Sequence, residues 1–319
     1  MIIIDNFKLV EEIINNSDHI NNDNYALFYL TAYGLIEQFG DKYLPLIKSL
    51  FDTTNFIVEV DDIESLCRET DFDVGEYSLD GLKALSSGGI SFTIDEENFS
   101  FKIFKNNPKI ICSSSGDVSF VLIEFVHEAL HILKSLVNNI SISDDGKSLA
   151  VRSGLYLDMT DISSDSVTEY TYNFLLDEII NVFQTTDVMK IISNIDTTVL
   201  PKSVLDFYMK LDLDKLVIPH GYEEYLELIE PLWNCESFKA NINNGIILGD
   251  LSSIEEHFNK VVGEDIFGQM SYSLDELYLS DLCDEEYDDT TTYISDVVSS
   301  YLNNMNAMNR KVKQNKVDS

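Results

Sequence analysis

The apolar residues of this chain follow a helical period most clearly between residues 117 and 137. They recur three or four positions apart and form one stripe, made of Val118, Val121, Leu122, Phe125, Ala129, Leu133 and Leu136. Further apolar residues occupy the opposite side, so we predict a helix that is buried on most of its circumference. Asp117 or Ser119 can cap its start, and Asn138 with Asn139 supplies stop signals.

Shorter apolar stretches upstream predict three strands, over residues 90–94, 100–104 and 109–112. Polar, turn-forming residues separate them, so we expect an antiparallel meander that leads into the buried helix. The edge strand of such a sheet can pair with an extended peptide by strand addition. The alternative is that these strands only cover the apolar helix.

The rest of the chain is predicted to be mainly helical. Before residue 90 the pattern indicates helices over 6–16 and 23–51, a strand over 55–60, short helices near Ile63 and Leu79, and a hinge at 86–89. After residue 187 it indicates helices over 202–213, 222–232, 252–262 and 291–313, and a frayed basic end from residue 309. We therefore expect three parts: a helical N-terminal lobe over 1–86, a core over 87–186 and a helical C-terminal lobe over 187–319.

The buried helix carries the pattern His-Glu-x-x-His at residues 127 to 131. Side chains four positions apart are neighbours on one helix face, so the rings of His127 and His131 can reach one zinc ion. Glu128 beside them can accept a proton from a water molecule that the ion activates. With five His and 56 acidic residues among 319, the pattern arises by chance on the order of 0.01 times. The alternative interpretation is a pair of core histidines with satisfied hydrogen bonds.

A catalytic zinc site needs a third protein ligand and an open fourth position. A second helix, predicted over 164–186, carries Glu169 and Glu178. Nine residues at about 100° each place these two side chains on opposite faces, so only one can point at the ion. Glu178 lies in the apolar half, where an unpaired carboxylate is costly, whereas Glu169 suits the first turns because of the helix dipole. We expect Glu178 to be the ligand; the other candidates are Glu169, Asp158, Asp161 and Asp177.

Three known arrangements of the third ligand do not match the sequence. The extended pattern His-Glu-x-x-His-x-x-Gly-x-x-His fails because Lys134 and Val137 stand at the last two positions. No Glu occurs between His131 and Glu169, so a ligand about 20 residues downstream is missing too. Peptide deformylases use a Cys from an upstream Glu-Gly-Cys segment, which the surroundings of Cys112 do not match.

Two later segments extend the pattern: Ser153-Gly154, and Leu-Asp-Glu-Ile-Ile-Asn-Val-Phe-Gln-Thr from residue 176. Together with His-Glu-x-x-His they resemble the layout of bacterial gluzincin-like metallopeptidases, in which Ser-Gly and Leu-Asn-Glu-Gly-x-Thr-Glu-x-x-Thr follow the histidines. Segments beginning at residues 221 and 249 look like the C-terminal helices of that group, so the resemblance spans roughly residues 90 to 275.

This resemblance implies an α+β fold with a zincin-like metallopeptidase core, a small antiparallel sheet and helical lobes. It also implies one Zn²⁺ per chain, held by His127, His131 and Glu178, with Glu128 as the general base. Asp177 and Ile179 stand where that group usually has Asn and Gly.

A hydrolytic zinc site commonly has a donor for the negative charge that develops on the substrate oxygen. Tyr222 is our first candidate, since it follows Pro219 and Gly221 in a turn that could overhang a cleft. The other candidates are Tyr170, Tyr172, His220 and Arg152. The chain has 16 Tyr, so packing is the alternative role for each tyrosine.

Composition narrows the range of partners. The 21 basic and 56 acidic residues give a formal net charge of −35, which argues against nucleic acid or an anionic membrane bound through a basic surface. We expect a peptide or protein substrate that is neutral or basic. The acidic run at 284–289 is expected to be a solvated face.

Cysteine usage and the N-terminus bear on the cellular setting. The four Cys, at positions 67, 112, 235 and 283, have no close pairing and suggest reduced thiols. The first residues lack the basic and apolar regions of a signal peptide, and no 18-residue apolar span follows. We therefore expect a cytoplasmic protein, with export by specialised machinery left open.

The function expected from these features is zinc-dependent hydrolysis of peptide bonds, with Glu128 as the general base. Two alternatives remain. The chain could be a catalytically inactive zinc-binding interaction protein, in which the protein fully coordinates the metal. It could also be a zinc hydrolase of a non-peptide amide, which a cleft without an accessible edge strand would indicate.

Overall fold

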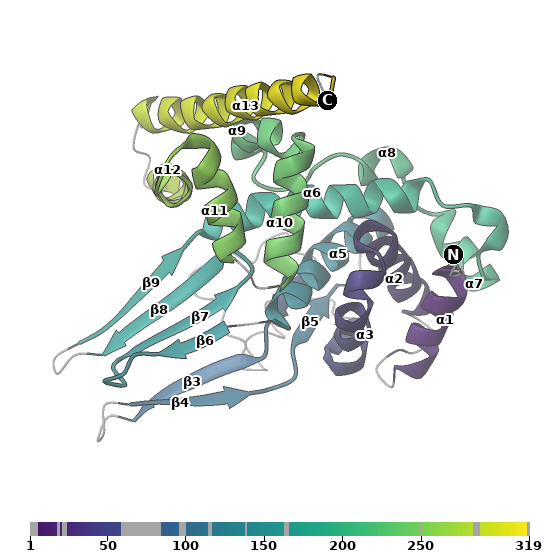
Figure 1. Ribbon diagram of the computed structural model, residues 1–319. Helices are drawn as coiled ribbons and strands as arrows, with labels where there is room; N and C mark the ends of the chain where they lie inside the picture. Colours follow the sequence, from purple (N-terminus) through teal and green to yellow (C-terminus); the bar gives the residue numbers. More distant parts are fainter. Residues whose placement is uncertain are drawn as a thin grey trace. The chain divides into compact units, whose positions relative to one another are not determined.

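The computed structural model of the chain is mainly helical with small β-sheets, a mixed α/β architecture (Figure 1). It describes residues 6–17, 20, 24–58, 84–95, 100–113, 117–137, 139–162, 166–248, 251–282 and 288–317. Contacts divide the chain into two units, each built from separated stretches. Unit 1 comprises Met1–Ile94, Lys102–Leu136 and Asn181–Pro219, and unit 2 comprises Asp95–Phe101, Val137–Ile180 and His220–Ser319. The three consecutive parts expected from the sequence remain a prediction about how the chain is organised.

In unit 1 a three-stranded sheet packs against the helix that carries His-Glu-x-x-His. The sheet has the order β1-β5-β2, and its strands are Asn55–Val58, Lys109–Cys112 and Ala84–Ser87. β5 is parallel to β1 and antiparallel to β2. The helix, α5 (Val118–Ser135), contacts both β2 and β5. One side of α5 is therefore covered by sheet.

Helices cover other parts of α5. It contacts α2 (Tyr25–Phe39) and α3 (Leu44–Thr53), and α1 (Asn6–Asn16) packs on α2. The single long helix predicted before residue 52 is wrong, because Gly40 ends α2 with a φ of 75° and a 3-10 turn then leads into α3. Aromatic rings join these elements: Phe125 of α5 lies 5.1 Å from Phe28 of α2, measured between ring centroids.

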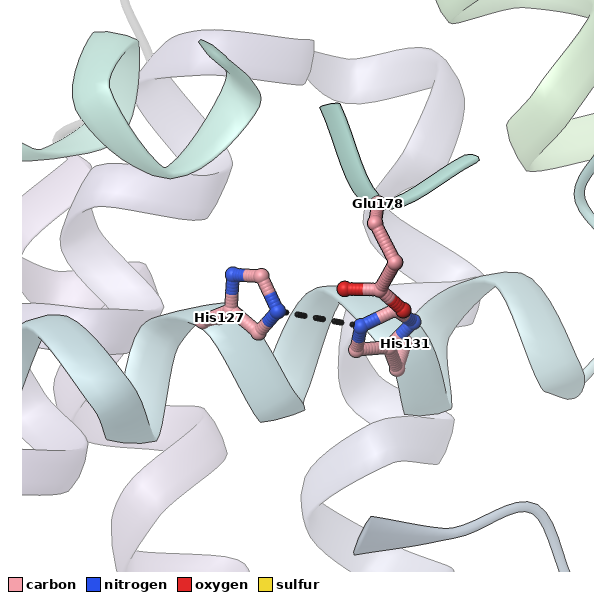
Figure 2. Close-up of side chains that lie close together, drawn as sticks. All are labelled: His127, His131 and Glu178. Carbon is pink, nitrogen blue, oxygen red and sulfur yellow. Dashed lines mark hydrogen bonds between the residues drawn. The ribbon is translucent and has the colours of Figure 1, made fainter. Parts of the chain in front are cut away.

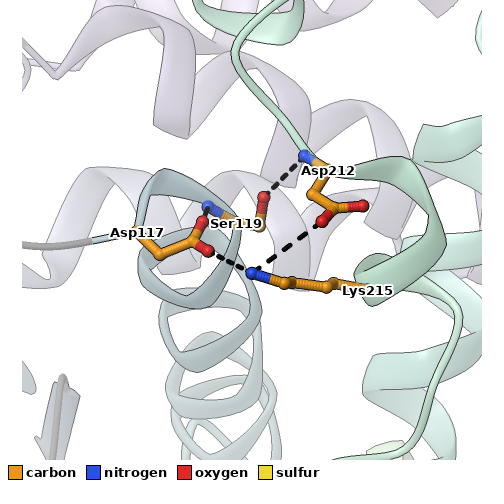
Figure 3. A network of polar contacts seen from close by, with 4 residues as sticks. All are labelled: Asp117, Ser119, Asp212 and Lys215. Atoms are coloured by element: carbon orange, nitrogen blue, oxygen red, sulfur yellow. Dashed lines mark hydrogen bonds and ion pairs between the residues drawn. The ribbon is translucent and has the colours of Figure 1, made fainter.

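A polar network joins the N-terminus of α5 to α8 (Leu213–Leu216), in unit 1 (Figure 3). Asp117 caps the helix, because its Oδ1 accepts a hydrogen bond from the backbone N–H of Ser119 at 2.9 Å. Its Oδ2 lies 2.6 Å from Nζ of Lys215. The Ser119 hydroxyl in turn accepts a hydrogen bond from the backbone N–H of Asp212 at 2.8 Å. The predicted start of the helix is therefore confirmed, with Asp117 as the cap.

The hairpin of β3 (Ile90–Asp95) and β4 (Ser100–Lys105) matches two of the predicted strands. β5, the third, does not join them, so the expected three-stranded meander is wrong. The Ser-Ser-Gly-Gly segment is not a hinge either: it ends β2 and turns into β3. Gly89 has a φ of 74°, and a Cβ there would lie 2.4 Å from the carbonyl oxygen of Asn106, so the tight turn requires glycine.

Unit 2 contains a four-stranded antiparallel sheet that the sequence pattern did not predict. Its order is β6-β7-β8-β9, and its strands are Asn139–Ile142, Ser148–Ser153, Tyr156–Ile162 and Val167–Tyr172. The helix predicted from residue 164 is wrong in its first third, which forms β9. The residues of β9, Val-Thr-Glu-Tyr-Thr-Tyr, are mainly β-branched and aromatic and favour a strand. The helix itself, α6, spans Phe174–Ser193.

The remaining helices agree in part with the predictions. They are α7 (Lys202–Tyr208) in unit 1, and α9 (Glu223–Trp233), α10 (Glu236–Leu248), α11 (Leu251–Val262), α12 (Ile266–Leu282) and α13 (Asp288–Val317) in unit 2. α9, α11 and α13 correspond to predicted helices, whereas α10 and α12 were not predicted. α13 continues to Val317, so it includes most of the basic segment from residue 309.

Some predictions lie outside the described residues. These are the short helices near Ile63 and Leu79, the end of the strand predicted over 55–60, Cys67, Cys283 and most of the acidic run at 284–289. The two described cysteines, Cys112 and Cys235, are free thiols. Among the helices that the structure describes, none has the length and hydropathy needed to cross a membrane.

We expect Asp117→Asn to lower stability at neutral pH but progressively less at acid pH. Hydrogen bonds from Lys215 and from the Ser119 N–H lower the pKa of Asp117. A carboxylate with a lowered folded-state pKa stabilises the fold above its unfolded-state pKa, about 3.9, and loses that contribution as the pH falls through the folded-state value. Urea-unfolding midpoints between pH 7 and pH 3 measure the effect. Asp214→Asn, an exposed position on α8, is the control, and an equal loss at every pH would contradict the assignment.

Candidate metal centre

His127, His131 and Glu178 lie together in the structure (Figure 2). One nitrogen of each ring and one carboxylate oxygen all lie within 4.8 Å of one another, and the three residues are half-buried. Nε2 of His127 is 3.1 Å from Nε2 of His131. Ligands about 2.0–2.1 Å from a tetrahedral zinc are roughly 3.3 Å apart, so the two rings already have ligand spacing. The same distance also suits a hydrogen bond between the rings.

Helix α6 places Glu178, and hydrogen bonds fix α6 on both sides of it. Before Glu178, Asp275 of α12 accepts a hydrogen bond from the backbone N–H of Leu175 at 2.8 Å, which satisfies a donor at the start of the helix. After it, the side-chain amide of Asn181 donates to the backbone carbonyl of His127 at 2.9 Å. Asn181 is fully buried. Glu178 lies one turn before it, so this bond holds α6 in register with the histidine helix.

Asp177 has a structural role that differs from that of a ligand. It is buried, and its Oδ1 accepts a hydrogen bond from the backbone N–H of Leu155 at 2.9 Å. The carbonyl of Leu155 accepts from the side chain of Asn173 at 3.0 Å. Gly154, in the turn between β7 and β8, has a φ of 64°. The Ser-Gly turn and the residue before Glu178 are therefore bonded to each other within unit 2.

The other sequence candidates for the third ligand lie on the unit 2 sheet. Glu169 is exposed on β9, and Asp158 on β8 accepts a hydrogen bond from the Thr171 hydroxyl at 3.0 Å. Burial raises the pKa of Asp158, with a smaller contribution from Glu169. Asp161 is paired across the sheet with Thr168. Within the described ranges, His127, His131 and Glu178 are the only group of metal-binding side chains brought together.

Tyr222 remains a prediction as the donor to a developing oxyanion. Its ring centroid lies 6.4 Å from that of Phe174, which is one helical turn before Glu178 on α6. Tyr222 has a φ of 56°, a left-handed conformation that costs energy for a residue with a side chain. Such strained positions occur at functional sites more often than elsewhere.

The other oxyanion candidates have contacts of their own. Tyr170 and Tyr172 stack on each other on the exposed strand β9, with ring centroids 6.4 Å apart. Arg152 donates to the Leu155 carbonyl at 3.4 Å, and burial lowers the pKa of its guanidinium. His220 lies in the segment between α8 and α9.

Glu128 points toward the sheet of unit 1. Its Oε2 accepts a hydrogen bond from the hydroxyl of Ser86 on β2. Cys112 on β5 is buried, and burial raises its pKa to about 12, with smaller contributions from the carboxylates of Glu124 and Glu128. Glu128 therefore follows His127 directly in the sequence, and its carboxylate is bonded to β2, the edge strand of the described sheet.

Sequence reasoning missed two residues that contact the motif. Asn181 had a usable signal, since it is a polar residue in an apolar helical run and must find a partner when buried. Ser86 had none: it lies 42 residues from Glu128, and the pattern assigned it to a hinge.

Comparisons with known proteins find no relative. No family model matches the chain, and no curated protein or solved structure is significantly similar to it. The interpretation of the site therefore depends on the geometry of the chain's own residues.

We expect protein purified without added zinc to contain about one zinc per chain. Glu178→Ala should lose it and Glu169→Ala should keep it, because only Glu178 lies with the two histidines. Elemental analysis by mass spectrometry measures the content of the three proteins side by side. Wild type that takes up no zinc even on reconstitution would contradict the site.

We expect Asn181→Ala to destabilise the fold by about 1–3 kcal/mol, because it removes the hydrogen bond between this fully buried amide and the His127 carbonyl and leaves a space where the side chain packed. Urea unfolding measures this change. Asn194→Ala is the matched control: its exposed amide bonds the carbonyl of Lys190 after the end of the same helix, and the change should be close to zero. An equal decrease in the free energy of unfolding in both variants would show that the bond to His127 contributes no more to stability than the exposed bond does.

Proposed function

We propose that this protein is a zinc-dependent metallopeptidase of gluzincin-like type, with His127, His131 and Glu178 as ligands and Glu128 as the general base. The observation that carries the proposal is the cluster itself: two histidines one turn apart and a carboxylate from a second helix, with ligand atoms within 4.8 Å. Three protein ligands leave a fourth position for water or substrate, which is the arrangement of catalytic rather than structural zinc sites.

The residues present fit the chemistry of peptide hydrolysis. A zinc ion bound at this cluster would polarise a water molecule and the substrate carbonyl. Glu128 takes the proton of the attacking water and passes it to the leaving amine. Imidazole and carboxylate ligands suit zinc. Of the two cysteines that the structure describes, Cys112 is buried, and burial raises the pKa of its thiol to about 12.

The position of β2 supports a peptide substrate over a small amide. Among the described strands β2 pairs only with β5, so it ends the sheet that packs on α5. An extended peptide could pair with such an edge through its backbone. The net charge of −35 favours a neutral or basic peptide.

We expect Glu128→Gln to keep its zinc and to lose activity by at least about 100-fold, since general-base catalysis contributes roughly 10²–10⁴ in rate. Cleavage of a mixed set of quenched fluorescent peptides, read alongside zinc content, measures this. Glu124→Gln is the control, because it removes a carboxylate one turn earlier on the same side of α5.

A Glu128→Gln variant that is as active as wild type would contradict the assignment of Glu128 as the general base. Wild type that binds zinc and cleaves no peptide would favour the inactive interaction protein or the hydrolase of a non-peptide amide.

A further inference from the structure

The carboxylate of Glu128 accepts a hydrogen bond from the hydroxyl of Ser86 on β2. From this contact we infer that Ser86 is a positioning residue, whose hydroxyl holds the Glu128 carboxylate in the orientation that proton transfer requires. The inference rests on the proposed peptidase function and extends it to a residue outside the His-Glu-x-x-His helix.

The register of the sheet places Ser86 independently of this bond. Side chains alternate along a strand, so Ala84 and Ser86 share one face of β2. Ala84 is fully buried and pairs with Cys112, and Ser86 pairs with Ile110. The face of the sheet that carries Ser86 is therefore the face that is buried at Ala84 and Cys112, and α5 contacts both strands.

The carboxylate of Glu128 needs such a partner. A glutamate side chain is long and has several rotamers, and Glu124 one turn earlier has the same charge, so the two carboxylates repel. A hydroxyl donor to an ionised oxygen forms a hydrogen bond roughly twice as strong as one between neutral groups. Because Ser86 occupies Oε2, Oε1 remains for the proton of the water molecule.

The reaction rate depends strongly on the position of the general base. A misplacement of about 1 Å can cost on the order of 100-fold in rate. Ser86 lies on a strand paired to β5 and in contact with α5, so its hydroxyl is held by regular structure instead of a loop. It can thus hold Oε2 while substrate binds and leaves.

The competing interpretation is that the bond only ties β2 to α5. A purely structural tie would change stability or substrate binding, and it would spare the rate of the chemical step. A positioning role predicts instead that loss of the hydroxyl reduces kcat and leaves KM unchanged. It also predicts rescue by threonine, which keeps the hydroxyl on a strand-compatible side chain.

The test compares wild type with Ser86→Ala, Ser86→Thr and Ser87→Ala on one fluorogenic peptide that the wild type cleaves. Ser87 is the matched control, because its side chain lies on the opposite face of the same strand. We expect Ser86→Ala to lower kcat 10- to 100-fold, roughly the effect of losing an outer partner of a metal site, with unchanged KM and zinc content. Ser86→Thr should recover most of the rate, and Ser87→Ala should match wild type.

Each other outcome overturns the inference. Active wild type with an equally active Ser86→Ala variant overturns it and leaves the proposed function standing. Three results would show that the bond has only a structural role: loss of zinc from Ser86→Ala, loss of its folded circular dichroism spectrum, or an equal decrease in kcat for Ser86→Ala and Ser86→Thr. A wild-type protein that binds zinc but cleaves no peptide overturns the proposed function, and the positioning role with it.

Discussion

The constraint on which the described structure depends is that α5 carries polar groups while it is buried on nearly every side. Its Lys134 is 1% exposed, and the His-Glu-x-x-His side chains are half-buried. Groups of this kind are costly to take out of water unless they are paired. The neighbours of α5 accordingly offer polar partners: Ser86 on β2, Asn181 on α6 and Lys215 on α8. Hydrogen bonding therefore adds to apolar packing in holding the elements around α5.

Helix α6 also carries buried or half-buried polar side chains, and three of them that lie close together in the sequence make different contacts. Asp177 bonds the turn between β7 and β8, Glu178 lies with the histidines, and Asn181 bonds the backbone of α5. The three residues lie within about one turn of α6, so the bonds of Asp177 and Asn181 hold the part of the helix that carries Glu178.

The sequence predicted local features well where one pattern dominated. The span of α5, its Asp117 cap and the hairpin strands β3 and β4 agree with the structure because periodicity and capping act over a few residues. Prediction failed where tertiary pairing decided the outcome. Val167–Tyr172 continues an apparently helical stretch yet forms β9, since its β-branched and aromatic side chains find a partner strand in β8. β5 leaves the predicted meander to pair with β1, 51 or more residues earlier in the chain.

The sequence by itself determined the chemistry available to this protein: two imidazoles and a carboxylate at helical spacing on one buried helix, and a choice of acids for a further ligand. Only the tertiary structure placed one of those acids, Glu178, beside the two histidines, because side chains 47 or more residues apart meet through packing and no local rule fixes which of them does. It likewise decided that Ser86 faces Glu128, which follows from the register of β2 on β5. A register is set by contacts across the whole sheet, and a shift of one residue would turn Ser86 to the opposite face.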